Sequence, residues 1–122
     1  METNKGEGYI SWKNSIQEYK INVANILTVK YARKKDRIII WYKYEKRDKI
    51  IVLNFNSDYL FDIIPPEEHS IIYFMETEND IFLVANQNEL KNERATFKFK
   101  INLSNGKLSK NGYGYYFSYC LN

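Results

Sequence analysis

The chain has 122 residues, of which 44% are apolar and 27% are charged, and its net charge is +3. This length and composition predict one globular domain over residues 1–122 and exclude a disordered chain. The small net charge selects no class of partner, and the single cysteine, Cys120, excludes an intrachain disulfide.

The first eight residues are polar and contain Gly6 and Gly8, which predicts a flexible segment over 1–8. A short strand is predicted over 9–13. The start lacks the apolar stretch of a signal peptide, and no apolar run approaches the roughly 18 residues of a membrane span. We therefore expect a cytoplasmic protein without membrane contact.

Residues 18–31 alternate between apolar and polar side chains, which is typical of a strand with one face in the core. Its apolar positions are Tyr19, Ile21, Val23, Leu27, Val29 and Tyr31. Asn25 interrupts this series and predicts a bulge or a bend. A turn over 33–36 leads to a strand over 37–45, which carries apolar residues on both faces.

A further turn over 46–48 leads to a strand over 49–55. Ser57 is suited to cap a short helical turn over 58–62, which the prolines at 65 and 66 would end. The segments that follow are a hairpin of strands 71–76 and 81–86 around residues 78–80, a strand over 94–103 and a final strand over 113–121. Asn105–Gly106 and Asn111–Gly112 are both typical of tight hairpin turns.

These segments amount to about eight strands with short connections, and no long helix separates them. The predicted fold is all-β and mainly antiparallel, with at most one or two short helical turns. A meander of this kind closes into a small barrel or folds into a two-sheet sandwich. The sequence leaves both arrangements open, because curvature depends on bulges and register.

Known catalytic and cofactor motifs are missing. One histidine, His69, and one cysteine cannot form a His- or Cys-based zinc site, and the five glycines fit no phosphate-binding loop. We therefore predict no metal, no cofactor and no catalytic residue. His69 is interpreted as a loop residue and Cys120 as a small buried one. A motif-poor enzyme with two carboxylates in a barrel cavity stays open as a second alternative.

Aromatic residues give the one positive indication of function. The chain has 11 Tyr, 7 Phe and 2 Trp, more than a small core can hide, and exposed Tyr and Trp are enriched at protein interfaces. The leading hypothesis is a non-catalytic protein that binds another protein, such as an inhibitor, antitoxin or immunity protein. The candidate binding residues are Ile39, Trp41, Lys43, Arg47 and Tyr73. Trp41 ranks first if its face is exposed; the competing interpretation is that this face is covered.

A basic strand face provides the alternative function, which is the binding of a small ligand or of single-stranded nucleic acid. Its candidate residues are Arg94, Lys98, Lys100 and Tyr116. Basic and aromatic side chains interleaved on a sheet can bind single strands. We favour the simpler interpretation, a solvated strand face whose lysines discourage edge pairing, and therefore do not expect nucleic-acid binding.

Overall fold

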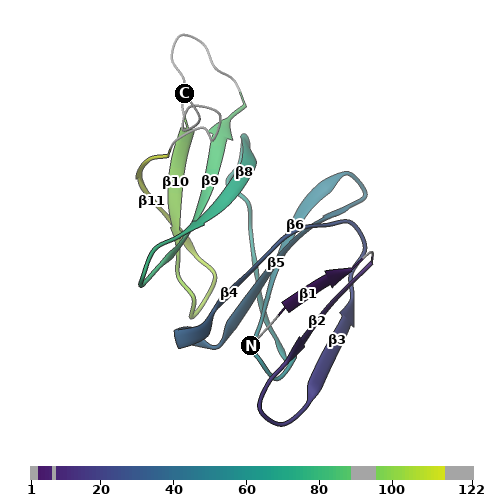
Figure 1. The fold of residues 1–122 in the computed structure, drawn as a ribbon. Coiled ribbons are helices and arrows are strands. Elements are labelled where there is room, and N and C mark those ends of the chain that lie inside the picture. The colour runs from purple at the N-terminus through teal and green to yellow at the C-terminus, as the bar shows by residue number, and fades with distance from the viewer. Residues whose placement is uncertain (1–2, 7, 89–95, 115–122) are drawn as a thin grey trace, which may run out of the picture. The chain divides into compact units, whose positions relative to one another are not determined.

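The computed structural model describes residues 3–6, 8–88 and 96–114, and the chain divides into two compact units, 1–64 and 65–122. Eleven strands lie in the described residues, all in antiparallel pairs, and they form three open sheets (Figure 1). The prediction of a mainly antiparallel β protein is therefore confirmed. None of these three sheets closes into a barrel, and the short helix at Arg33–Lys35 is the single helical element described.

The first unit holds two of the sheets. One sheet has the order β1-β2-β3 and the other the order β4-β5-β6-β7. The strands are β1 (Thr3–Gly6), β2 (Tyr9–Lys13), β3 (Glu18–Asn22), β4 (Ile26–Ala32), β5 (Arg37–Tyr44), β6 (Arg47–Leu53) and β7 (Tyr59–Ile63). Residues 3–6 pair with β2, where the sequence predicted a flexible end. The long strand predicted over 18–31 is divided at Asn25, whose φ of 59° makes the bend by which the chain changes sheet.

The core of this unit lies between its two sheets. Its buried residues are Ile10, Trp12, Ile38, Ile40 and Leu53. Alternation explains why these residues meet, because side chains two apart along a strand share one face of the sheet. Half-buried side chains from both sheets surround this cluster, among them Tyr19, Ile21, Val29 and Tyr42.

The second unit is a single sheet with the order β11-β10-β9-β8. Its strands are β8 (His69–Glu76), β9 (Ile81–Gln87), β10 (Thr96–Ile101) and β11 (Leu108–Tyr113). The hairpin predicted around residues 78–80 is confirmed, and the amide of Thr77 donates to the carbonyl of Asp80 at its closed end.

Two turns in the second unit differ from the prediction. Gly106 has a φ of 80°, as expected of a turn, but the connection between Ile101 and Leu108 is longer than two residues. Asn111–Gly112 lies inside β11, where the pairing with β10 slips between Phe97 and Phe99. A bulge, rather than a hairpin, uses the positive φ of Gly112.

The region after β6 was predicted as a helical turn and is a strand. The side-chain oxygen of Asn54 accepts from the amides of Asn56 and Asp58, which makes a tight loop. Ser57 takes a positive φ inside this loop instead of capping a helix. The chain then returns as β7 along β6, and the helical prediction for 58–62 is wrong because cross-strand pairing satisfies this backbone.

The β5–β6 turn lies one residue earlier than predicted and is left-handed at both central positions, Glu45 (φ 50°) and Lys46 (φ 66°). These angles match a type I′ turn, for which Asn and Gly are far better suited. Replacing Glu45 with Asn and Lys46 with Gly should raise the free energy of unfolding by about 1 kcal/mol, because side chains other than Asn and Gly are strained there. Urea denaturation checks this; an unchanged or lower midpoint would contradict the turn geometry.

Candidate functional site

The clearest open surface of the first unit lies where the core ends along β5. Ile38 and Ile40 belong to the core cluster, and Tyr42, two residues further, is half-buried at its margin. Tyr44 continues the same face and is 58% exposed. The face of the four-stranded sheet that packs against β1–β3 is therefore exposed to solvent at the end that carries Tyr44.

Neighbouring strands add charged residues and one more tyrosine to this face. Tyr44 pairs with Arg47, Tyr42 pairs with Lys49, and Arg47 and Lys49 are both exposed. On β7, Asp62 and Tyr59 face the same way, because they pair with Ile51 and Leu53 of this side. We call these six residues the tyrosine patch: Tyr42, Tyr44, Arg47, Lys49, Tyr59 and Asp62. Ile64, which follows β7, is 79% exposed and flanks it.

Tyr59 is held in place although it is 60% exposed. Its hydroxyl donates a hydrogen bond of 3.0 Å to Oδ1 of Asp62. This hydrogen bond, together with the negative charge of Asp62, raises the pKa of Tyr59 above its ordinary value of 10.0. A fixed aromatic ring loses less conformational freedom on binding than a mobile one, so Tyr59 is suited to anchor a partner.

The Tyr59 hydrogen bond predicts a pH effect. The folded chain favours the neutral phenol of Tyr59, so the hydrogen bond adds slightly to the stability of the fold. This contribution is complete below pH 10 and is lost as the pH rises through the raised pKa of Tyr59. We expect Asp62→Ala to lower the pKa of Tyr59, followed by NMR of the ring signal. Asp62→Asn keeps an oxygen acceptor without the charge and should give an intermediate pKa. An unchanged Tyr59 titration in Asp62→Ala would show that the hydrogen bond does not form.

The ion pairs of the described residues do not include the two cations of the patch. Within the described part of the chain, carboxylates pair with Lys43 and Lys100, through Asp48 and Asp80 respectively. Neither Arg47 nor Lys49 takes part in these pairs. The patch thus combines two exposed cations with two exposed tyrosines.

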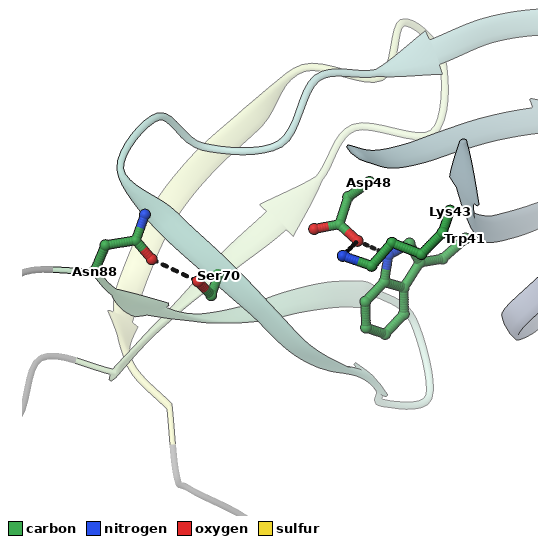
Figure 2. Close-up of polar contacts among 5 residues, drawn as sticks. All are labelled: Trp41, Lys43, Asp48, Ser70 and Asn88. Carbon is green, nitrogen blue, oxygen red and sulfur yellow. Dashed lines mark hydrogen bonds and ion pairs between the residues drawn. The ribbon is translucent and has the colours of Figure 1, made fainter. Parts of the chain in front are cut away.

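Trp41, the first choice for an exposed anchor, is buried. Its side chain is 8% exposed and that of Ile39 is 1% exposed. The indole nitrogen donates to Oδ1 of Asp48 at 2.8 Å, and the ammonium of Lys43 lies 2.8 Å from the same oxygen (Figure 2). The exposed Ile–Trp pair that the interface hypothesis assumed is therefore wrong, because both faces of β5 are buried here. The alternative that this face is covered is confirmed.

Asp48 is the acceptor on which this cluster depends. Replacing Asp48 with Ala should lower the free energy of unfolding by about 1–3 kcal/mol, because it removes the acceptor of the hydrogen bond from the indole N–H of Trp41. Asp48→Asn retains an oxygen acceptor and loses only the ion pair to half-exposed Lys43, for which about 0–1 kcal/mol is expected. Chemical denaturation of both variants measures this, and equal losses would mean that the indole bond contributes nothing.

The remaining candidates are spread over the second unit. Tyr73 is half-buried on β8. On β10, the ammonium of Lys98 lies 5.1 Å from the ring centroid of Phe82, and that of Lys100 lies 3.5 Å from Asp80. Arg94 and Tyr116 lie outside the described residues, as does Cys120. The proposed basic face is therefore described only at Lys98 and Lys100, both of which already have a partner within the protein.

His69 lies at the start of β8, not in a loop. Its Nδ1 donates to the carbonyl of Glu67 at 2.6 Å, and its ring meets Phe99 edge-on with centroids 5.5 Å apart. Nε2 is buried and has no hydrogen-bond partner among the described residues. One nitrogen of His69 is therefore bonded to the backbone, and the ring packs edge-on against Phe97 and Phe99.

The other polar contacts of the second unit are structural. The hydroxyl of Ser70 donates to the side-chain oxygen of Asn88 at 2.5 Å, which links the start of β8 to the residue that follows β9 (Figure 2). Thr96 donates to Asn86 between β10 and β9. The described residues contain no group of three or more His, Cys, Asp or Glu side chains that could hold a metal ion. They also include no helix long and apolar enough to cross a membrane.

Sequence reasoning missed Tyr59 and Asp62 as surface residues of a sheet. Part of the signal was present, because Tyr59, Phe61 and Ile63 stand at every second position, as in a strand. The register shift between Val52 and Leu53, which brings Tyr59 to the face of Asp62, has no such mark in the sequence. A capping serine and two prolines nearby favoured the helical interpretation instead.

The chain matches no protein-family model, no curated protein and no solved structure in comparisons of its sequence and fold.

Proposed function

We propose that this protein is a non-catalytic binding protein that docks another protein on the tyrosine patch. The observation that carries the proposal is the exposure of Tyr44 (58%) and Tyr59 (60%) on a face of the sheet whose other residues include the buried Ile38, Ile40 and Leu53. Tyrosine brings a large contact area at a low cost in conformational entropy, and it is enriched among interface hot spots. Arg47 and Lys49 supply a charged rim.

The alternative functions have less support. A nucleic-acid or ligand site on the Lys98–Lys100 face would need free cations, whereas Lys100 is paired with Asp80 and Lys98 lies over Phe82. A carboxylate enzyme would need two acids facing each other across a cavity, and the carboxylate of the patch accepts a bond from Tyr59 instead. An inhibitor- or immunity-type role is one form that the proposed protein binding could take.

To test this proposal, peptides that bind the full chain are selected from a random display library. Selected peptides should bind the Tyr44→Ala/Tyr59→Ala variant about 30-fold more weakly, which corresponds to the usual hot-spot threshold of about 2 kcal/mol. The melting temperature of this variant should stay nearly unchanged, because both side chains are exposed. The control is Tyr113→Ala, which removes a tyrosine that is 72% exposed on β11, outside the patch. Binding that Tyr113→Ala weakens and the double variant does not would refute the patch.

A further inference from the structure

We infer that the tyrosine patch takes an acidic protein segment, with carboxylates set beside apolar or aromatic side chains. This inference rests on the proposed function and adds the chemistry of the partner. The observation behind it is the pairing of β5 with β6. Both patch tyrosines on β5 lie directly opposite a cation on β6: Tyr44 is opposite Arg47, and Tyr42 is opposite Lys49.

Side chains directly opposite on antiparallel strands have Cβ atoms about 4.5–5.5 Å apart. The two tyrosines on β5 and the two cations on β6 therefore form two parallel rows, in which each cation lies across from a tyrosine. A carboxylate that approaches Arg47 or Lys49 can bring a side chain on the same face of its own segment onto Tyr44 or Tyr42. A segment that presents acidic and apolar side chains side by side on one face matches this arrangement.

The cations are available for such a partner. Arg47 and Lys49 are exposed and neither forms an ion pair within the described residues, in contrast to Lys43, which lies on the other face and is held by Asp48. Arginine also offers a planar fork of donors that binds a carboxylate through two parallel hydrogen bonds. Opposite charge at a rim chiefly accelerates association and selects the partner.

Asp62 favours a protein partner over a nucleic acid. Its carboxylate lies beside Tyr59, the most exposed ring of the patch, and carries a negative charge that a stacked nucleotide would meet with its phosphate. Non-specific strand binding needs a groove of cations that follows the phosphate backbone. Two cations and one carboxylate do not make such a groove, whereas a peptide can place an acidic group at Arg47, which lies further along β6 than Lys49 from the position opposite Asp62.

The same selection of peptides that bind the full chain provides the test, and the measured quantity is the net charge of the selected peptides. Peptides whose binding depends on Tyr44 and Tyr59 should carry an excess of Asp and Glu. The Arg47→Glu/Lys49→Glu variant should bind them about tenfold more weakly or worse, and the loss should shrink as salt rises. The matched control is Lys34→Glu/Lys35→Glu, which makes the same charge change at exposed positions of the Arg33–Lys35 helix.

The outcomes separate the two proposals. Tyrosine-dependent peptides that are neutral or basic, or that lose equal affinity in both charge-reversal variants, would overturn the acidic partner and leave protein docking standing. Peptides indifferent to Tyr44 and Tyr59 would overturn the docking function itself. Displacement of the selected peptides by a random single-stranded RNA pool, with loss in Arg47→Glu/Lys49→Glu, would replace the protein partner by a nucleic acid and overturn the inference.

Discussion

Replacement of Trp12 by alanine is expected to lower the free energy of unfolding by about 3–5 kcal/mol, the usual cost of truncating a buried aromatic side chain. Trp12 is 1% exposed and lies in the core between the two sheets of the first unit. Its ring stacks on that of Tyr19, its cross-strand partner, with centroids 5.5 Å apart. Its indole nitrogen donates to the carbonyl of Phe55 at 2.9 Å, so alanine also removes the link between β2 and the loop after β6.

Trp12→Phe is the matched control for this prediction. Phenylalanine keeps an aromatic ring against Tyr19 and removes the hydrogen bond to Phe55, so the loss should be clearly smaller than that of alanine. Guanidinium denaturation followed by circular dichroism measures both variants. A loss below about 1 kcal/mol for Trp12→Ala would be typical of a surface position and would contradict the core assigned to this unit.

The second large effect is expected at Leu83, where replacement by alanine should cost about 2–5 kcal/mol. Leu83 is fully buried on β9, the interior strand between β8 and β10. Its direct partners on these strands are Phe74 and Phe99, which are also buried, so alanine opens a cavity between two aromatic rings. Lys107→Ala, an exposed change in the same unit, should alter stability by less than about 0.5 kcal/mol.

Leu83→Ala also tests the prediction of a single domain over 1–122. Both tryptophans, Trp12 and Trp41, lie in the first unit, so tryptophan fluorescence reports the unfolding of that unit alone. If the chain unfolds as one cooperative domain, the fluorescence transition shifts to lower denaturant together with the circular dichroism transition. A fluorescence transition that stays at the wild-type midpoint would mean that the two units unfold independently.

Alternation predicted most of the strands, because a half-buried strand has a period of two wherever its neighbours lie. Residues 9–13, 37–45 and 71–76 were placed on strands that the structure shows with nearly the same bounds. The division of the strand predicted over 18–31 between two sheets could not be predicted. Asn25 indicated a bend, but a bulge within one sheet and a change of sheet interrupt the apolar pattern in the same way.

The exposure of a strand face could not be predicted in this way. Period two correctly placed Trp41 on the opposite side of β5 from Ile40. It could not say whether that side is covered, because burial of a second face depends on packing that is remote in sequence. A similar limit applies to Asn111–Gly112, where a hairpin turn and a bulge both use a glycine at positive φ.

The tyrosine patch depends on two features that lie beyond strand assignment. The first is the register of β5, β6 and β7, which brings Tyr44, Arg47 and Asp62 to one face. The second is the limit of the sheet β1-β2-β3, whose packing covers Ile38 and Ile40 and leaves Tyr44 outside the core. Strand register and the burial of one sheet face by another sheet both depend on residues that are distant in sequence. Neither can therefore be predicted from a single segment.

Chemical-shift mapping on the full ¹⁵N-labelled chain tests the central claim most directly, with a short peptide rich in glutamate and tyrosine as the probe. The largest amide shifts should fall on Tyr44, Arg47, Lys49 and Tyr59, and the same peptide with lysine in place of every glutamate should not produce them. Shifts confined to β8–β11, or equal shifts with the acidic and basic peptides, would contradict an acid-selective docking surface on the tyrosine patch.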